Sequence, residues 1–155
     1  EQLPATTGKL LAAGRKVAVA ESCTGGGLAK LLTDAPGSSQ WFECGWVTYS
    51  NAAKQRDLGV RPDTLERYGA VSDPTVRELA LGALARSGAD MALAISGVAG
   101  PDGGTARNPV GSVWFARAVR GADPPVVVRH QNFNGTRASI RRQALLLALR
   151  WLADP

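Results

Sequence analysis

The chain has 155 residues, 45% of them hydrophobic, and this length and composition are typical of one compact domain. Its net charge of +5 suits an anionic substrate or a nucleic acid equally well. Two cysteines and one histidine are too few for a disulfide framework or a zinc cluster, no apolar run reaches the roughly 18 residues of a membrane span, and the N-terminus has no signal-peptide pattern. We therefore expect one soluble, cytoplasmic domain over residues 1–155, with no metal site and no membrane segment.

The first predicted strand leads into a glycine turn. Residues 16–20, KVAVA, are a short β-branched run typical of a buried strand. The turn ESCTGGG follows over residues 21–27, and leucines at helical spacing then predict a helix that ends before Pro36. This order of strand, turn and helix places Ser22 at the carboxyl end of a strand.

A second junction of the same kind follows. Residues 41–50 predict a strand, and residues 51–59 predict a helix that Asn51 caps and a glycine ends. Tyr49 and Lys54 therefore stand at a second strand-to-helix junction. The loops beyond the carboxyl ends of strands form the ligand crevice of open α/β sheets, so both junctions are candidate site positions.

A third strand end lies in the middle of the chain. The clearest helical pattern has Asp73 as its expected N-cap, a proline in its first turn and Gly88 at its end. Residues 90–96 then predict a buried strand with Ser96 at its carboxyl end, and the glycine-rich residues 97–111 predict a loop. Three candidate positions thus fall at strand ends.

The last third of the chain predicts a hairpin and a helix. Residues 112–119 and 126–133 are strand-like runs joined by a glycine and proline turn, and a helix begins near Thr136. Arg137 and Arg141 stand one turn apart on this helix, away from its apolar stripe. The chain as a whole predicts an α/β fold, a layered domain with a mixed, mostly parallel sheet flanked by helices, because the final pair of strands fits a hairpin better than a crossover.

The glycine turn has a chemical use besides its shape. Gly25, Gly26 and Gly27 leave main-chain N–H groups unobstructed at the start of a helix, where the helix dipole adds partial positive charge. Such a turn receives a phosphate or a developing oxyanion, and it serves equally as a tight turn that needs glycine for its backbone angles alone. The pattern matches neither the P-loop nor the dinucleotide-binding fingerprint.

Two adjacent side chains, Ser22 and Cys23, compete as nucleophile. The single histidine, His130, lies in a strand-like run without an evident partner, so a Ser-His-Asp triad is not expected. A buried lysine with a lowered pKa can accept the proton of the nucleophile in place of a histidine. Lys54 suits that role, with Tyr49 as proton relay or orienter. An ordinary surface lysine and a tyrosine packed in the core explain the two residues equally. Neighbouring residues of an extended segment point to opposite faces, so Cys23 is expected in the core.

Four motifs taken together are more specific than any one of them. They are AESCTGGGLAKLLTDAPGSS, TYSNAAKQRDLGV, YGAVSDPTV and ISGVAGPDGGTARNPVGSVWFA, in this order along the chain. With them the chain resembles the CinA C-terminal domain family, whose members include nicotinamide-nucleotide amidases. The resemblance implies hydrolysis of the carboxamide of nicotinamide mononucleotide, giving nicotinic acid mononucleotide and ammonia, with no cofactor and no metal.

The resemblance also implies roles for single residues. Ser22 matches the nucleophile of the family, Tyr49 and Lys54 match the tyrosine and lysine that activate it, and Ser96 stands where the family usually has threonine. The implied substrate-binding residues are Thr24, Gly25, Gly26, Ser96, Gly100, Gly103, Gly104, Thr105, Arg137 and Arg141. The arginines and the glycine loop are the candidates for the phosphate, because the planar fork of arginine suits bidentate contact. The family commonly reads GDR where residues 135–137 read GTR.

Further expectations concern partners. Many family members carry an additional N-terminal domain that resembles molybdopterin-binding proteins; this sequence does not contain one, so we expect a stand-alone amidase. Family members are commonly oligomers, and we expect a homo-oligomer that acts on a pyridine mononucleotide. Two alternatives stay open: a catalytically inactive nucleotide-binding module in which Lys54 stays protonated, and, on the charge of +5, a nucleic-acid or competence-related partner protein.

Overall fold

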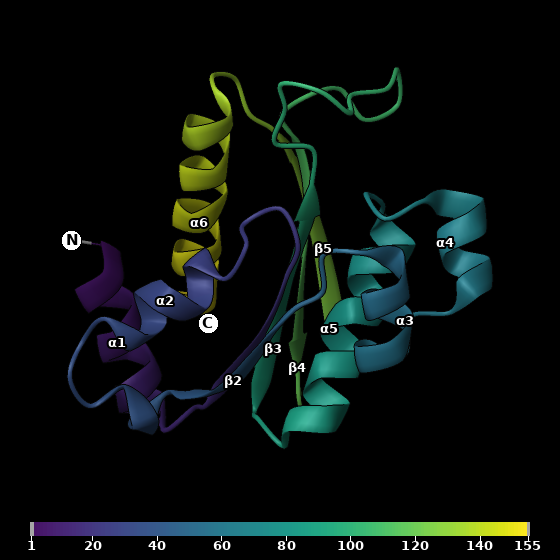
Figure 1. Cartoon of the computed structure of the whole chain (residues 1–155). Coiled ribbons are helices and arrows are strands. Elements are labelled where there is room, and N and C mark those ends of the chain that lie inside the picture. The colour runs from purple at the N-terminus through teal and green to yellow at the C-terminus, as the bar shows by residue number, and fades with distance from the viewer. Residues whose placement is uncertain (1, 155) are drawn as a thin grey trace.

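One sheet lies between two groups of helices in the computed structural model, which describes residues 2–154 (Figure 1). Its elements follow the order α1 (Gln2–Ala13), β1 (Val17–Glu21), α2 (Gly27–Thr33), the 3₁₀ turn η1 (Ser38–Gln40), β2 (Phe42–Val47), α3 (Asn51–Leu58), α4 (Pro62–Tyr68), α5 (Asp73–Ser87), β3 (Met91–Gly97), β4 (Ser112–Val119), β5 (Val126–Asn132) and α6 (Arg137–Ala153). Helices α1, α2 and α6 lie on one side of the sheet, and α3, α4 and α5 lie on the other (Figure 1). The predicted layered α/β fold is confirmed.

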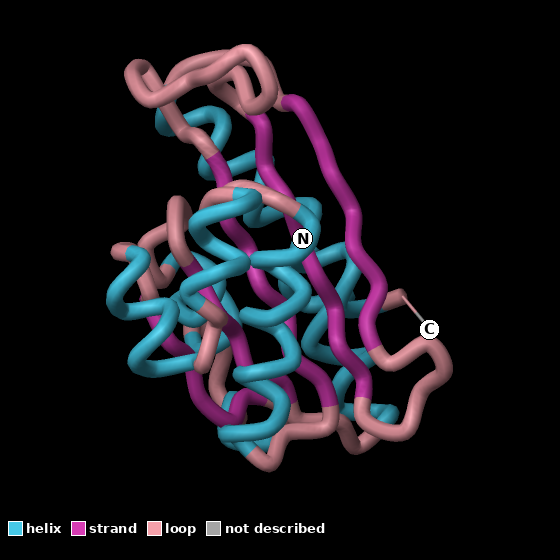
Figure 2. Tube along the Cα trace, turned by 90° about the vertical axis from the view of Figure 1, so that its right-hand side faces the viewer, coloured by secondary structure: helices cyan, strands magenta, loops and turns pink. Residues whose placement is uncertain are grey.

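The sheet combines parallel and antiparallel pairing. Its strand order is β2-β1-β3-β4-β5, in which β1 pairs parallel with β2 and β3, and β4 pairs antiparallel with β3 and β5. The strands run side by side in one layer (Figure 2). Only β4 runs against the others, so the expected mixed sheet with most strands in one direction is confirmed, as is the hairpin. The carboxyl ends of β1, β2 and β3 meet at one edge.

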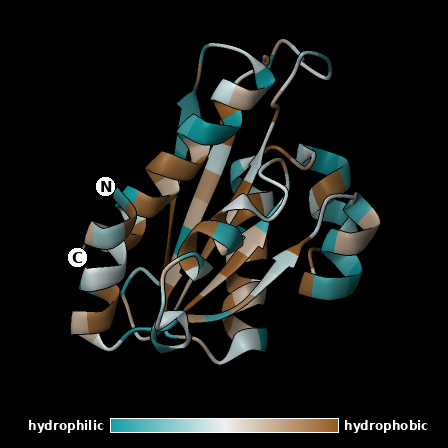
Figure 3. Ribbon diagram, turned by 60° about the vertical axis from the view of Figure 1, so that its left-hand side comes forward, coloured by the Kyte–Doolittle hydropathy of each residue, from teal (hydrophilic) through white to brown (hydrophobic). Residues whose placement is uncertain are grey.

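Alternate residues of β1 pack on different helical layers, because successive side chains of a strand point to opposite faces. Val17 and Val19 join the core beneath α1, α2 and α6, whereas Ala18 and Ala20 face α5. The face toward α5 consists of alanines in the three central strands: Ala18, Ala20, Ala92, Ala94, Ala116 and Ala118. These small side chains let α5 approach the sheet closely, and the apolar strands lie between the two helical layers (Figure 3).

Two helices start one residue away from the predicted position. Ser50 caps α3 with its hydroxyl, which accepts from the Ala53 N–H at 3.0 Å, so the expected cap at Asn51 is wrong. Ser72 caps α5, and the expected cap at Asp73 is wrong because that residue is already helical. In both cases two good capping residues are adjacent, and the backbone conformation selects the serine.

Two helices lie outside the predicted elements. α1 has Gly8 in its middle, which weakens local helix preference, and a proline in its first turn, where proline is tolerated. It is held by packing on α6, where the buried Thr6 hydroxyl donates to the Leu149 carbonyl at 2.7 Å. α4 begins at Pro62 and has only 7 residues, too few to show a helical period. We infer that tertiary contacts, rather than local sequence preference, stabilise both helices.

Candidate active site

Three strand ends bring Ser22, Thr48 and Ser96 to one edge of the sheet. Ser22 directly follows β1, Thr48 directly follows β2, and Ser96 is near the end of β3. The main chain keeps the three strands in register, because the Ser22 N–H donates to the Ile95 carbonyl at 3.1 Å and the Thr48 N–H donates to the Glu21 carbonyl at 2.9 Å. All three hydroxyl-bearing side chains are buried there.

Lys54 reaches this edge from α3. Because Ser50 starts the helix, Lys54 lies one turn in, and its side chain leans back toward the helix N-terminus and the sheet. Its Nζ lies 3.2 Å from the Ser22 Oγ and donates to the carbonyl oxygens of Thr48 at 2.7 Å and Tyr49 at 3.0 Å. The side chain is 1% exposed, so this lysine is not an ordinary surface residue.

The surroundings of Lys54 favour its neutral form. Burial lowers the pKa of its amine from 10.5 to about 8, because the ammonium loses its hydration. Its three hydrogen-bond partners are a hydroxyl and two carbonyls, none of which carries a charge that would offset the burial. A neutral amine has two N–H groups for the two carbonyls, which leaves its lone pair for the Ser22 hydroxyl. The geometry therefore suits a general base.

Cys23 lies in the core between the sheet and α2, as its place next to Ser22 predicted. Burial raises the pKa of its thiol from 9.0 to about 11, against smaller opposing effects of its own main chain and of Arg141. A thiol with such a pKa stays protonated at neutral pH, and the protonated thiol is a poor nucleophile. Of the two adjacent candidates, only Ser22 has a base within hydrogen-bond distance.

The glycine turn presents fewer N–H groups than the sequence suggested. Gly25 and Gly26 have φ angles of 59° and 95°, which only glycine adopts readily, so the turn shape does require them. The Gly25 N–H donates to the Ser22 carbonyl at 3.0 Å and is therefore not free for a ligand. Within residues 2–154 the N–H groups of Thr24 and Gly26 find no main-chain acceptor, and they remain as candidate oxyanion donors.

Glu21 is a site residue that the sequence reading missed. Its carboxylate is 1% exposed and accepts three hydrogen bonds, from the Thr24 hydroxyl at 2.6 Å and from the N–H groups of Leu28 and Ala29 at 2.9 Å each. These N–H groups belong to the start of α2, so the helix terminus already binds an anion of the protein and does not receive a substrate phosphate. An acidic residue just before a predicted helix start was the signal for this role.

Tyr49 touches Lys54 through its main chain only. Its carbonyl accepts from the Lys54 amine, whereas its hydroxyl accepts from Arg137 at 3.3 Å and its side chain is 59% exposed. Arg137 also donates to the Gly100 carbonyl at 2.7 Å. The two side chains thus link the end of β2, the start of α6 and the loop after β3 above the strand ends.

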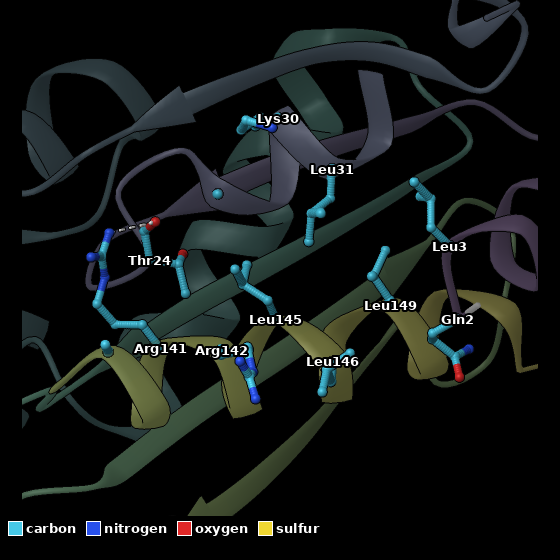
Figure 4. Close-up of a pocket in the computed structure, with 12 residues that line it drawn as sticks. Gln2, Leu3, Thr24, Lys30, Leu31, Arg141, Arg142, Leu145, Leu146 and Leu149 are labelled. Atoms are coloured by element: carbon cyan, nitrogen blue, oxygen red, sulfur yellow. Dashed lines mark hydrogen bonds between the residues drawn. The ribbon is translucent and has the colours of Figure 1, made fainter. Parts of the chain in front are cut away.

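Arg141 lies behind the glycine turn. Its guanidinium donates from Nε to the Cys23 carbonyl at 3.1 Å and from Nη2 to the Thr24 carbonyl at 3.3 Å. On this side a cavity of about 520 Å³ opens between α1, α2 and α6, and Arg141 and Thr24 line one end of it (Figure 4). Neither Ser22 nor Lys54 lines that cavity, so it is separate from these two residues.

Within residues 2–154, the tip of the glycine loop makes no hydrogen bond to Ser22 or Lys54. Gly103 and Gly104 are exposed, and a Cβ placed on either would first meet Val98 or Val110 of the same loop. Thr105 is exposed as well and exchanges hydrogen bonds with Asn108. The expectation that these three residues bind substrate is therefore not supported by any contact with the site, whereas Gly100 contacts Arg137.

The histidine has partners of its own in the hairpin. The His130 ring stacks on Trp114 with the ring centroids 4.2 Å apart, and its Nε2 hydrogen-bonds to the Ser112 Oγ at 2.8 Å.

Across residues 2–154 no three His, Cys, Asp or Glu side chains gather as metal ligands would. None of the helices described in that range is long and apolar enough to cross a membrane.

Comparison with known proteins decides the family. The model of the CinA C-terminal domain matches residues 1–155. The chain belongs to the CinA C-terminal domain family. Escherichia coli K12 has a relative named nicotinamide-nucleotide amidohydrolase PncC that is 52% identical over 97% of this CinA domain and 91% of its own length. A relative of the same name from Enterobacter agglomerans is 55% identical over 90% of this chain and 84% of its own.

Solved structures of CinA superfamily proteins have the same fold as this CinA domain. One from Klebsiella pneumoniae 700603 is 38% identical, with a TM-score of 0.93 over 98% of this chain and 93% of that chain. The competence/damage inducible protein CihA from Agrobacterium tumefaciens is 39% identical, with a TM-score of 0.92 over 98% of this chain and 94% of that chain. The arrangement of strands that brings Ser22 next to Lys54 is thus a property of the family fold.

Proposed function

We propose that this CinA domain hydrolyses the carboxamide of nicotinamide mononucleotide and releases ammonia and nicotinic acid mononucleotide. The observation that carries the proposal is the buried Lys54 amine, which lies 3.2 Å from the Ser22 hydroxyl and has its pKa lowered to about 8. A serine nucleophile needs such a base in order to attack an amide. The names of the two bacterial relatives support the choice of substrate.

Lys54 acts as the base in the first half of the reaction. Its neutral amine takes the proton of the Ser22 hydroxyl while the oxygen attacks the carboxamide carbon and a C–O bond forms. The Thr48 and Tyr49 carbonyls accept from the two amine N–H groups and keep the lone pair directed at Ser22. The ammonium then gives its proton to the amide nitrogen, the C–N bond breaks, and ammonia leaves.

Water completes the cycle. Neutral Lys54 takes a proton from the water that attacks the ester carbon, the bond to the Ser22 oxygen breaks, and the proton passes from Lys54 to that oxygen. In both halves the carbonyl oxygen of the substrate becomes negative. We assign the Thr24 and Gly26 N–H groups as its donors, and one such donor contributes about 3–4 kcal/mol in acyl transfer.

Arg137 is our candidate for the substrate phosphate. Its guanidinium is exposed beside the strand ends and uses one N–H on the Gly100 carbonyl and one on the Tyr49 hydroxyl. Three further N–H donors of an arginine remain for a phosphate in that position. Tyr49 serves as the orienter in this proposal, since it holds Lys54 by its carbonyl and Arg137 by its hydroxyl.

Ammonia release from nicotinamide mononucleotide tests the proposal. Purified wild type, Ser22→Ala and Cys23→Ala are assayed with a chelator present, and circular dichroism checks that the variants fold. We expect release by the wild type and by Cys23→Ala, and loss with Ser22→Ala, because only the serine oxygen has a base beside it.

Other outcomes point elsewhere. Saturable binding of the mononucleotide without ammonia release would replace the enzyme by a binding module in which Lys54 stays protonated and donates to all three of its partners. Loss of release with Cys23→Ala and not with Ser22→Ala would move the nucleophile to the thiol. The homo-oligomeric state and the cytoplasmic location stay predictions, which sedimentation velocity and cell fractionation test.

A further inference from the structure

We propose that Glu21 and Arg141 clamp the catalytic turn from two sides and thereby orient its oxyanion donors, so that Arg141 is a positioning residue and not a phosphate ligand. This inference rests on the proposed amidase function and adds two residues to its machinery. The turn between them carries Ser22 and the Thr24 N–H.

The anionic side of the clamp is the Glu21 carboxylate. It is buried beneath the turn and accepts from the Thr24 hydroxyl and from the first N–H groups of α2. Because Glu21 immediately precedes Ser22, one carboxylate ties the residue before the nucleophile to the helix that follows the turn. A carboxylate with three charge-assisted hydrogen bonds in a buried place holds its partners more firmly than neutral groups do.

The cationic side of the clamp is the Arg141 guanidinium. It donates to the carbonyls of Cys23 and Thr24, two successive peptide units of the turn. The C=O and N–H of a planar trans peptide unit point in opposite directions. Holding the Cys23 carbonyl toward α6 therefore directs the Thr24 N–H away from α6, and that N–H has no main-chain acceptor within residues 2–154.

The two arginines of α6 thus differ in what they touch. Arg137 is exposed and hydrogen-bonds to the loop and the Tyr49 hydroxyl, whereas Arg141 is half-buried, and both of its hydrogen bonds go to main-chain oxygens of the turn. The Arg141 Nη2 also lies 3.2 Å from the place that a Cβ on Gly25 would take, so the guanidinium packs directly on the turn. Arg141 keeps three further N–H donors, as Arg137 does, but its guanidinium is half-buried against the turn and not exposed beside the strand ends.

Steady-state kinetics with two substrates separate positioning from phosphate binding. The variants are Arg141→Ala, Arg141→Lys and Glu21→Gln, with Arg142→Ala as the matched control, because Arg142 is the exposed neighbour that lines the separate cavity. The substrates are nicotinamide mononucleotide and nicotinamide riboside, which has the same carboxamide and no phosphate. Thermal unfolding is measured on each variant.

We expect Arg141→Ala and Glu21→Gln to lower kcat by about a hundredfold, the usual effect of a lost oxyanion donor, with KM changed by less than about threefold. The loss is the same factor on both substrates. Arg141→Lys recovers part of kcat, because an ammonium reaches one carbonyl and not two. The control Arg142→Ala keeps wild-type kinetics.

Two results would overturn the clamp while the amidase function stands: unchanged kcat in Arg141→Ala and Glu21→Gln, or an increase of KM for the mononucleotide alone in Arg141→Ala. If the wild type does not turn over the riboside, the mononucleotide alone distinguishes the two roles: a loss of kcat supports the clamp, and an increase of KM supports phosphate binding. If Glu21→Gln does not fold, the two Arg141 variants decide. A wild type that releases no ammonia from either substrate refutes the proposed function itself, and the clamp with it.

Discussion

The pH dependence of ammonia release tests the neutral-amine role of Lys54. With a pKa of about 8, about a tenth of the amine is neutral at pH 7 and half of it at pH 8. Only the neutral amine accepts the Ser22 proton, so kcat/KM is expected to rise about tenfold from pH 6 to 7, about fivefold from pH 7 to 8, and about twofold beyond. A lysine with its ordinary pKa of 10.5 would give a tenfold rise per pH unit up to about pH 10.

The assay uses initial rates of ammonia release with nicotinamide mononucleotide well below its KM, where the rate reports kcat/KM of the free enzyme. A phosphate monoester loses its second proton near pH 6, so the series runs from pH 6.5 to 9.5, where the dianion of the substrate predominates. Circular dichroism at each pH confirms that the fold is intact. Lys54→Arg is the matched variant, because it keeps the positive charge and cannot lose its proton.

Two results would refute this account of Lys54. A profile that is flat from pH 6.5 to 9, or one that still climbs tenfold per unit above pH 9, contradicts a base whose pKa burial has lowered to about 8. A Lys54→Arg enzyme with more than about a tenth of wild-type kcat/KM contradicts proton transfer to this side chain, because arginine stays protonated in proteins. We expect Lys54→Arg to be as inactive as Lys54→Ala.

Three more predictions concern stability and packing. The unfolded chain holds the Lys54 proton up to about pH 10.5, and the folded chain holds it only up to about pH 8. The free energy of unfolding of the wild type is therefore expected to rise with pH between these values, by about 3 kcal/mol in all. The same rise is not expected in Lys54→Met, and urea unfolding of both proteins at pH 7 and pH 10 measures the difference. Gly82→Ala places a Cβ against the Leu58 carbonyl where α5 crosses α3, so we expect a loss of about 1–3 kcal/mol and lower activity through displacement of α3, whereas Gly8→Ala, which meets open space, is neutral or stabilising. Cys23→Ala keeps kcat within a few fold of wild type in the ammonia assay, because the thiol is buried and protonated.

The sequence predicted that Ser22 and Lys54 lie at the same edge of the sheet, because the signals for both positions are local. The run before Ser22 is apolar and β-branched, and the run before Tyr49 is rich in aromatic residues. A glycine turn or a capping serine follows each run, and parallel strands place such junctions at one edge of the sheet. Even the misplaced cap of α3 left Lys54 in the first turn of its helix. One residue of error at Ser50 therefore did not change which side chain reaches Ser22.

The contacts of α6 with the turn could not be predicted in the same way. Arg141 and Cys23 are 118 positions apart in the sequence, and no local pattern states that the last helix packs behind the first turn. A main-chain carbonyl and a phosphate oxygen are both acceptors for a guanidinium, so an arginine near a site suggests either partner until the backbone is placed. Glu21 differs from Arg141, because its partners lie only 3, 7 and 8 positions further along the chain, where a local sequence signal could have identified them.

One physical cause, burial at the strand ends, acts in opposite directions on the pKa values of the proposed base and of the rival nucleophile. It disfavours the charged form of each, so it lowers the pKa of the Lys54 amine to about 8 and raises that of the Cys23 thiol to about 11. Near neutral pH the first change creates a usable base, and the second removes a usable thiolate. Serine gains most from this combination, because its hydroxyl needs a neighbouring base, whereas cysteine needs its own ionisation. The desolvated strand end thus favours the serine and lysine chemistry that we propose, even though cysteine is the stronger nucleophile in water.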